Sequence, residues 1–440
     1  MEVSSIEGTE AGNGVNLDLD NLLTKQAVAS RFEYTARGRR PAQWIFDGGW
    51  PDPSTFPVED LSRLAGQVLR ASDALQYDPS EEGGLRYGHS ELRRLLAART
   101  ASASGQPFDL PNIMLCAGGV HGLALILRAF VGPGDIAAVE GPTWGVALDL
   151  LRERGAETIA LPLDDDGIVI DTLEERLRSL AHAGQRLKLV YTIASFHTPT
   201  GVSLSIDRRR RLLELAETWG FLIVEDNVYG DIRFAGQQTP TVLELDTAAS
   251  VLRLDSFSKT VAPALRLGWI TGPSDALTAL AGIRNDLGVS RWTAAMIAEY
   301  LNEGLFDRHL THVNDLYLRK RDAVVQAMLE HCGDLARWRL PSGGFFLWVE
   351  LDSSVDCRRA MRRAWAEGVI CRPGERFFGN TDAARQFLRI AYSQVPTDKI
   401  EAGIEVLGKA LRASVPRTRV DFLPRKVAQS GTPDESLPDA

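Results

Sequence analysis

Short runs of apolar residues alternate with amphipathic stretches from about residue 110 to residue 272. The apolar runs have the length and composition of buried strands, and the stretches between them have apolar residues at helical spacing. Because strand and helix alternate in this way, the sequence predicts an α/β fold with a mainly parallel sheet covered by helices on both faces. The predicted strands are Asn112–Cys116, Ile136–Glu140, Leu187–Ile193, Phe221–Val224, Val251–Leu254 and Leu267–Thr271.

The pattern changes beyond Gly272. Residues 275–332 are predicted to be helical throughout, with one long amphipathic helix that includes Arg308–Glu330. An apolar strand within 343–351, a helix at Cys357–Glu367 and a strand at Phe387–Ala391 follow, which predicts a smaller α+β domain. We expect a flexible arm at 1–20, an N-terminal segment at 21–57 that packs with the small domain and holds a helix at Asn21–Arg31, a large domain at 58–305, the small domain at 306–412 and a flexible tail at 413–440.

Composition narrows the class of protein. The chain has 440 residues, 44% of them hydrophobic, and a net charge of -9. Its one basic run, Arg208–Arg211, is expected on a solvated helix face, so nucleic acid is not an expected partner. The four cysteines have no metal-ligand spacing, which predicts reduced thiols and no metal site. Without a signal peptide or a membrane-spanning run, we expect a soluble cytoplasmic protein.

Lys259 is the candidate nucleophile. It follows the strand at Val251–Leu254, and a lysine in a partly desolvated pocket loses its proton easily and attacks an aldehyde. Ser256 and Ser258 offer hydroxyl donors, and Arg266 offers a planar fork suited to a phosphate. These residues indicate a phosphorylated aldehyde cofactor, although an isolated motif of this kind also fits a surface lysine.

Other stretches fit the same ligand. The small residues Ala117–Val120 between a strand and a helix point backbone N–H groups at a phosphate, or form only a tight turn. Asp226 is placed just past a strand end, where its carboxylate would keep a pyridine nitrogen protonated, and Tyr229 could donate to a phenolate oxygen. A solvated carboxylate and a half-buried ring remain the alternative for that pair. The segment at 46–57, rich in glycine and proline, lets the backbone approach another group closely, although a structural turn alone explains its composition about as well.

These motifs occur in the order and spacing of a known family. Along residues 40–412 the chain resembles the class I/II aminotransferases of pyridoxal phosphate fold type I. The matching positions are Tyr77, Gly118, Gly119, Pro142 to Trp144, Pro199 to Gly201, Asp226, Tyr229, Ser256 to Lys259, Arg266, Gly268, Gly343 to Phe346 and Arg389.

The resemblance implies the fold, the cofactor and the roles of individual residues. The fold would be a mainly parallel seven-stranded sheet flanked by helices, and the assembly a homodimer with shared sites. Lys259 would form a Schiff base with pyridoxal phosphate and move a proton, with Asp226 at the pyridine nitrogen and Tyr229 at the phenolic oxygen. The other implied cofactor contacts are Gly118, Gly119, Val120, Ser256, Ser258 and Arg266 at the phosphate, Trp144 on the ring, Thr198, and Tyr77 of the partner subunit; Gly49 and Arg389 would bind the substrate.

Three positions depart from the family pattern. Thr198 replaces an asparagine that donates to the phenolic oxygen, Gly119-Val120 replaces polar residues at the phosphate turn, and Asp255 replaces a glycine. The leading hypothesis is transfer of an amino group between an amino acid and a keto acid. Because of Thr198, β-elimination at a C–S bond and decarboxylation with deamination, in natural-product biosynthesis, remain alternatives. A third alternative is a non-catalytic protein that binds the cofactor. A regulator with a DNA-binding module in front is not expected, because only about 40 residues precede the Gly48-Gly49 segment, they are acidic overall, and such a module needs roughly 60 residues or more.

Overall fold

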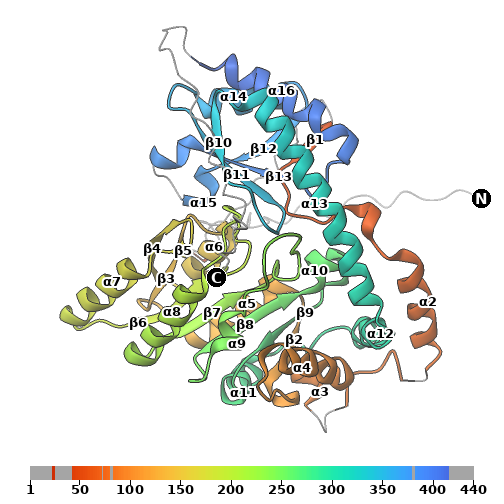
Figure 1. Cartoon of the computed structure of the whole chain (residues 1–440). Helices are drawn as coiled ribbons and strands as arrows, with labels where there is room; N and C mark the ends of the chain where they lie inside the picture. The colour runs from red at the N-terminus through yellow and green to blue at the C-terminus, as the bar shows by residue number, and fades with distance from the viewer. Residues whose placement is uncertain (1–21, 25–41, 72, 80–82, 379–381, 416–440) are drawn as a thin grey trace, which may run out of the picture. The chain divides into compact units, whose positions relative to one another are not determined.

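The computed structural model describes residues 22–24, 42–71, 73–79, 83–378 and 382–415. From residue 40 onward the chain forms one unit, which is built around two sheets (Figure 1). The larger sheet has the strand order β2-β9-β8-β7-β6-β3-β4-β5. Its strands are β2 (Ile113–Cys116), β3 (Ile136–Gly141), β4 (Glu157–Asp164), β5 (Gly167–Ile168), β6 (Leu187–Thr192), β7 (Leu222–Asp226), β8 (Val251–Ser256) and β9 (Gly268–Thr271).

The larger sheet is mainly parallel, as the sequence predicts. Strands β8, β7, β6, β3 and β4 pair in parallel, whereas β9 runs antiparallel to both of its neighbours, β8 and β2. Side chains alternate between the two faces, so that Val224 and Leu252 join one buried core while Ile223 and Val251 join another. Because both faces are buried, the strands are continuous apolar runs, which is the pattern that identified them.

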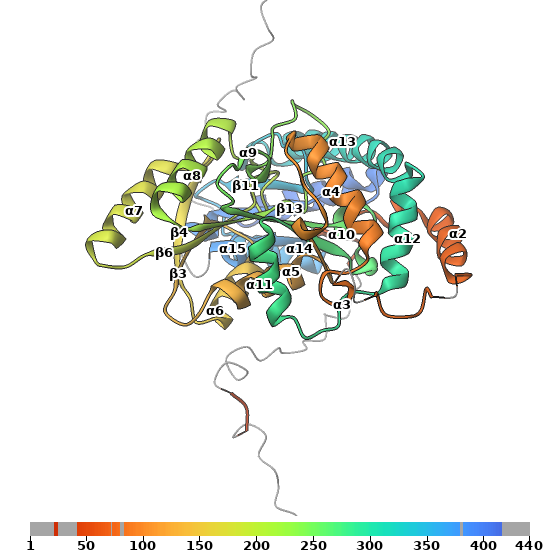
Figure 2. The same cartoon turned by 90° about the horizontal axis from the view of Figure 1, so that it is seen from below.

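Helices cover both faces of this sheet (Figures 1 and 2). One core includes residues of α5 (Gly119–Phe130), α6 (Gly145–Glu153) and α11 (Ser274–Ile283), and the other includes residues of α7 (Ile170–His182), α8 (Ile206–Trp219) and α9 (Val242–Leu245). A third cluster joins α2 (Val58–Leu69), α4 (Ser90–Ser104) and α12 (Arg291–Asn302). The short helices α3 (Gly84–Tyr87), α10 (Phe257–Thr260) and η4 (Pro263–Leu265) lie in the connections.

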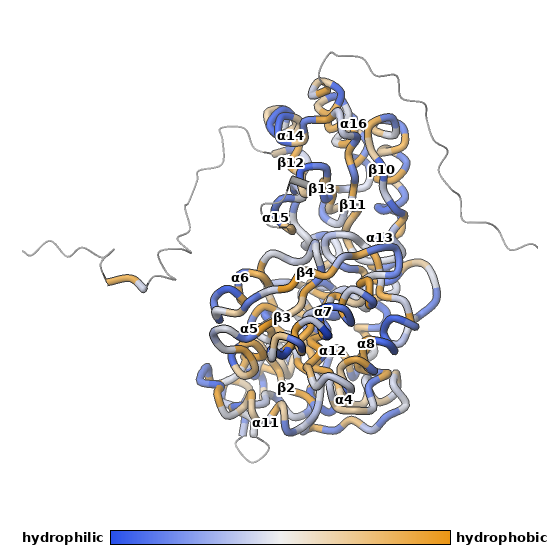
Figure 3. The backbone as a smooth tube through the Cα atoms, turned by 90° about the vertical axis from the view of Figure 1, so that its left-hand side faces the viewer, coloured by the Kyte–Doolittle hydropathy of each residue, from blue (hydrophilic) through white to orange (hydrophobic). Residues whose placement is uncertain are grey.

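The smaller sheet has the order β1-β12-β13-β11-β10. Its strands are β1 (Trp44–Phe46), β10 (Ala336–Trp338), β11 (Phe346–Leu351), β12 (Val369–Pro373) and β13 (Phe387–Ala391), and it packs against α14 (Cys357–Ala366) and α16 (Ile400–Arg412), with α15 (Glu375–Phe378) nearby in the chain. Helix α13 (Leu305–Cys332) contributes Phe306 to the cluster beside the larger sheet and Met328 to the core of the smaller one. In Figure 3 the hydrophobic stretches of the tube gather along the strands and the inner helices.

Several predicted details differ from the structure. Strand β4 was not predicted because most of its residues are exposed or half-buried, which weakens the apolar signal. The short strands β1, β10 and β12 were not predicted either, and the segment 284–290 interrupts the helices expected throughout 275–332. Arg209 was expected on a solvated face, which is wrong: it is buried and donates to the carbonyl oxygens of Leu204, Pro240 and Ala194.

Some predictions lie outside what the structure describes. The arm at 1–20 is one, as are all but residues 22–24 of the helix at Asn21–Arg31 and all but 413–415 of the tail. The domain boundaries at 57, 305 and 412 remain predictions. No helix in the described part of the chain combines the length and apolar character needed to cross a membrane.

Candidate active site

Lys259 lies on the single turn α10 that directly follows β8, and Ser256 caps this turn by accepting a hydrogen bond from the Ser258 N–H at 3.1 Å. The Lys259 amine donates to the carbonyl oxygen of Gly49 at 2.6 Å and lies 5.6 Å from the centroid of the Tyr229 ring. Burial lowers the pKa of this amine to about 8, and the charge of Asp226 opposes part of that shift. More of the amine is therefore neutral near pH 7 than in an ordinary lysine, as a nucleophile or proton acceptor requires.

Asp226 is the last residue of β7, so the prediction that it lies just past the strand end was wrong: the strand continues two residues beyond its predicted end at Val224. Its carboxylate is buried, and Oδ2 accepts a hydrogen bond from the Tyr191 hydroxyl at 2.7 Å. Burial raises the pKa of Asp226 to about 6, while the hydrogen bond from Tyr191 lowers it. Because hydrogen bonds from the chain offset only part of the cost of its burial, this carboxylate favours a ligand that is cationic or donates an N–H to it.

Tyr229 lies near Lys259, three residues after Asp226. Its ring makes edge contacts with Phe345 and Phe346 at centroid distances of 5.5 and 5.4 Å, and burial raises the pKa of its hydroxyl. Gly49 lies directly against this pair: a Cβ built on it would be 2.6 Å from Phe346 Cζ and 2.9 Å from the Tyr229 hydroxyl. The glycine therefore permits a close backbone approach, which the sequence predicts for this segment.

The residues expected to bind phosphate lie together at the start of α5. Gly118 caps the helix with φ 86°, and a Cβ on it would lie 3.0 Å from both terminal nitrogens of Arg266. Arg266 itself has φ 47° and donates to the carbonyl oxygen of Ala117 at 2.7 Å. Gly119 and Val120 begin the helix, so their N–H groups have no acceptor within it. The hydroxyls of Ser256 and Ser258 lie 2.9 Å apart on the neighbouring turn. Exposed N–H groups beside a guanidinium form a site for a dianion.

Arg389 enters from β13 of the smaller sheet. One terminal nitrogen donates to the Thr198 hydroxyl at 3.3 Å, and the other donates to the carbonyl oxygen of Asp47. The guanidinium carbon lies 4.3 Å from the centroid of Phe346 and 4.8 Å from that of Phe377. Its Nε is buried and has no hydrogen-bond partner among the described residues. Because an unpaired buried donor is costly, this nitrogen indicates a ligand with an acceptor such as a carboxylate.

In the described part of the chain, Tyr77 and Trp144 form no hydrogen bond or ring contact with the other predicted site residues. Tyr77 is 69% exposed, and its carbonyl oxygen accepts from Arg291 at 3.2 Å. Trp144 is half-buried at the N-cap of α6 and packs against the core beneath the larger sheet.

A second buried carboxylate lies behind the site. Glu140 accepts hydrogen bonds from the Thr192 hydroxyl at 2.6 Å and from the Ile193 N–H at 3.0 Å, and its Oε2 lies 3.2 Å from His197 Nε2. His197 is 1% exposed, so the expectation of a solvated histidine was wrong, whereas a supporting role remains open. The sequence signal that could have identified Glu140 was a charged residue at the end of an apolar strand. Nothing in the sequence marked Tyr191 as a site residue beyond its position in a predicted strand.

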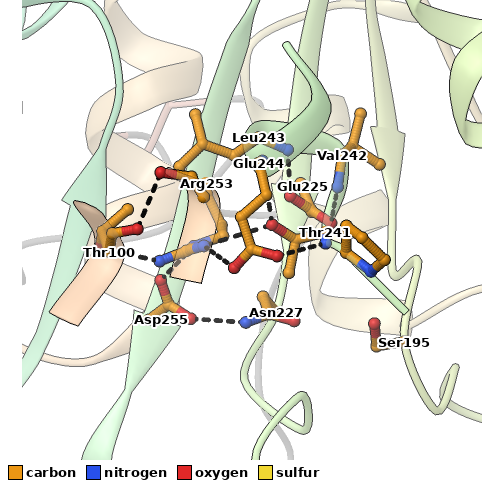
Figure 4. A network of polar contacts seen from close by, with 12 residues as sticks. Thr100, Ser195, Glu225, Asn227, Thr241, Val242, Leu243, Glu244, Arg253 and Asp255 are labelled. Carbon is orange, nitrogen blue, oxygen red and sulfur yellow. Dashed lines mark hydrogen bonds and ion pairs between the residues drawn. The ribbon is translucent and has the colours of Figure 1, made fainter. Parts of the chain in front are cut away.

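A network of buried and half-buried polar residues joins the ends of β7 and β8 (Figure 4). Asn227 donates to Asp255 at 2.8 Å, and Asp255 accepts from Arg253 at 2.8 Å. Arg253 also lies 3.5 Å from Glu244. Asn227 follows Asp226, Asp255 precedes Ser256, and the hydrogen bond between them therefore connects the ends of the two strands. A glycine at position 255 has no carboxylate and could not accept this bond.

A family model described as aminotransferase class I and II matches residues 61–407. The chain is 36% identical over 369 residues to the aromatic-amino-acid aminotransferase 1 of Thermococcus litoralis, a match that covers 83% of this chain and 87% of that protein.

Two solved structures share the fold. The multiple substrate aminotransferase of Thermococcus profundus is 32% identical with a TM-score of 0.82, covering 90% of this chain and 99% of that one. The kynurenine aminotransferase of Pyrococcus horikoshii, solved in complex with PMP, with KYN as substrates and KYA as products, is 31% identical with a TM-score of 0.82, covering 90% and 98%.

Proposed function

Since the chain belongs to the aminotransferases of class I and II, it is an enzyme that transfers amino groups with pyridoxal phosphate, and we propose that Lys259 and Arg389 define its active site. The resemblance stated from the sequence is confirmed at the level of family, fold, cofactor and reaction. The roles of individual residues, the subunit arrangement and the substrate are our proposals.

The residues at the site fit pyridoxal phosphate. Gly118 leaves room that a Cβ would fill beside Arg266, and the α5 N-terminus faces the same space, which suits the phosphate. Asp226 offers a buried carboxylate for the protonated ring nitrogen, and that partner would offset the cost of its burial. When bound, the cofactor supplies an aldehyde for the amino group and a ring that withdraws electrons from the substrate carbon.

The chain's own residues would bind and move protons around that group. Lys259, with its lowered pKa, would accept the proton from the substrate carbon and deliver it to the cofactor. The Tyr229 hydroxyl would donate a hydrogen bond to the phenolic oxygen of the cofactor, because burial keeps this hydroxyl protonated. Thr198 supplies a second hydroxyl close to Arg389.

The observation that carries the proposal is the buried, unpaired Nε of Arg389. The same guanidinium donates to the Asp47 carbonyl oxygen, two residues before the Gly49 carbonyl oxygen that accepts from Lys259. A guanidinium held between two phenylalanine rings is suited to the α-carboxylate of an amino acid. Aromatic amino acids are the first proposed donors, supported by the relative that acts on them and by the phenylalanine and tyrosine rings at the site.

The test is a panel of L-amino acids added to purified holoenzyme, with the absorbance of the bound cofactor recorded. We expect at least one aromatic amino acid to convert the cofactor to its amino form and yield the matching keto acid. Pyruvate with a thiol, or carbon dioxide with an aldehyde, as stoichiometric product would contradict the proposed reaction and favour the alternatives based on Thr198. Lys259→Ala should abolish turnover and the absorbance of the lysine-linked cofactor together, and a fully active variant would overturn the assignment.

We further propose a homodimer in which Tyr77 reaches the phosphate of the other subunit. Tyr77 is 69% exposed and Leu75, two residues before it, is 81% exposed, so this loop presents apolar surface to a partner. Mixing Lys259→Ala subunits with Tyr77→Phe subunits tests this. A dimer of the two kinds has one site with both native residues only if Tyr77 acts across the interface. Activity recovered on mixing supports the proposal, and no recovery, or a monomer by light scattering, contradicts it.

A further inference from the structure

The segment from Asp47 to Asp52, which we call the strap, has no regular secondary structure and crosses the site. The backbone oxygens of Asp47, Gly49 and Trp50 accept hydrogen bonds from three side chains distant in sequence. The carbonyl of Asp47 accepts from Arg389, that of Gly49 from Lys259 at 2.6 Å, and that of Trp50 from Ser393 at 2.6 Å. The strap therefore contacts both Arg389, which we propose binds the substrate carboxylate, and the reactive amine of Lys259.

An ion pair holds each end of the strap. The Asp47 carboxylate pairs with Arg372, whose Nη2 lies 2.7 Å from Oδ2. At the other end Asp52 Oδ2 accepts from Lys320 at 2.5 Å, and the Asp52 N–H donates to the Tyr317 hydroxyl at 3.0 Å. Lys320 also donates to the carbonyl oxygen of Ser393 at 2.5 Å, so it joins the strap to the residue that binds Trp50.

The two pairs differ in their surroundings. The side chain of Arg372 is 35% exposed, whereas that of Lys320 is 1% exposed and that of Asp52 is 11% exposed. Removing one partner of a buried pair leaves the other charge without compensation, so water or another conformation must satisfy it. Because no helix or strand holds residues 47–52, that adjustment would move the strap.

We propose that Lys320 is a positioning residue for the amino acid substrate: through Asp52 and Ser393 it fixes the strap, and the strap sets the placement of Arg389 relative to Lys259. Lys320 lies on α13 and touches neither group. The inference rests on the proposed roles of Lys259 and Arg389.

The test compares holoenzyme carrying Lys320→Met, which keeps the length of the chain and removes its charge, with the wild type. Lys409→Met is the matched control, since it removes a lysine from an exposed pair with Glu405 on α16. Asp52→Asn is the second variant, in case Lys320→Met folds poorly. Three quantities are measured: amide hydrogen exchange of residues 47–56, KM and kcat for the donor found with the panel, and the pH midpoint of the bound cofactor's absorbance.

We expect faster exchange in 47–56 for Lys320→Met and Asp52→Asn and not for Lys409→Met. We also expect KM to rise about tenfold or more, with a smaller change in kcat, because a small displacement of Arg389 weakens productive binding of the substrate carboxylate. Unchanged exchange overturns the proposal, and so does faster exchange with KM unaltered, since the strap would then be held by Lys320 without positioning Arg389.

If the panel finds no amino donor, the proposed function is contradicted, but the positioning role of Lys320 can still be tested. The pH midpoint of the bound cofactor's absorbance then decides whether Lys320 has that role. The midpoint should shift in Lys320→Met, because the strap contacts Lys259, and not in Lys409→Met. A midpoint equal to that of the wild type would refute a positioning role.

Discussion

The hydroxyl of Tyr191 donates a hydrogen bond to Asp226 across 2.7 Å inside the larger sheet. Both residues lie on neighbouring parallel strands, β6 and β7, and both are buried. Asp226 therefore has a neutral partner on one oxygen, and its ionisation depends on that single hydroxyl more than on any cation of the chain.

Replacing Tyr191 by Phe should move the acid limb of the activity profile upward in pH. The hydrogen bond lowers the pKa of Asp226, so its loss raises that pKa and the carboxylate is formed only at higher pH. A profile of kcat/KM against pH measures the limb. An unchanged limb with reduced activity throughout would show that Tyr191 acts on packing instead.

Asp226→Asn should stabilise the cofactor-free protein at pH 8 while weakening cofactor binding. Burial raises the pKa of Asp226 from 3.8 to about 6, so the unfolded chain binds fewer protons between these values and stability falls as the pH rises through them. The variant escapes this loss, which is at most about 3 kcal/mol. Urea unfolding at pH 4 and pH 8 checks it: the gain should appear at pH 8 and shrink at pH 4, and an equal gain at both values would contradict the assignment.

Gly49→Ala should destabilise the protein and impair activity. The added methyl group would meet Phe346 at 2.6 Å and the Tyr229 hydroxyl at 2.9 Å, and such overpacking costs about 1–3 kcal/mol. Gly66→Ala on α2 is the control, since nothing lies within 4 Å of its Cβ. Thermal unfolding should show a lower Tm for the first variant and an equal or higher Tm for the second. Equal stability of Gly49→Ala and the wild type would mean that the strap moves freely.

Thr198→Val should raise KM for the amino acid. The substitution keeps the shape of the side chain and removes the acceptor of the Arg389 hydrogen bond at 3.3 Å, and a hydrogen bond to a charged group contributes about 1.5–3 kcal/mol. The expected change is about tenfold or more. Steady-state kinetics measure it, with Thr311→Val on the exposed side of α13 as control. If KM stayed constant and only kcat fell, Thr198 would act on the cofactor rather than through Arg389.

The sequence predicts those parts of the site that depend on local structure. Lys259 follows a fully buried strand that ends at Ser256, and Gly118 is the N-cap of a helix, so the local pattern was sufficient to place them. The fold was predicted for the same reason, because strands buried on both faces are apolar along their whole length. Strand β4, which is mostly exposed or half-buried, lacks that signal.

Arg209, Lys320 and Asp52, whose roles depend on distant partners, were not predicted. Arg209 was assigned to the surface because its neighbours in sequence are charged, yet its acceptors come from residues 194, 204 and 240. Lys320 and Asp52 are separated by 268 positions and carry no local mark of their contact. The partners of buried polar groups follow from the packing of elements, which no short-range pattern contains.

Helix α13 has 28 residues, which corresponds to about 42 Å of continuous helix. It supplies side chains to the cluster beside the larger sheet, to the aromatic cluster around Tyr229 and to the core of the smaller sheet. The two sheets consequently pack against the same helix, and neither can unfold without removing packing contacts from the other. Denaturation of residues 42–415 should therefore be a single cooperative event, with no partly unfolded species that keeps one sheet alone.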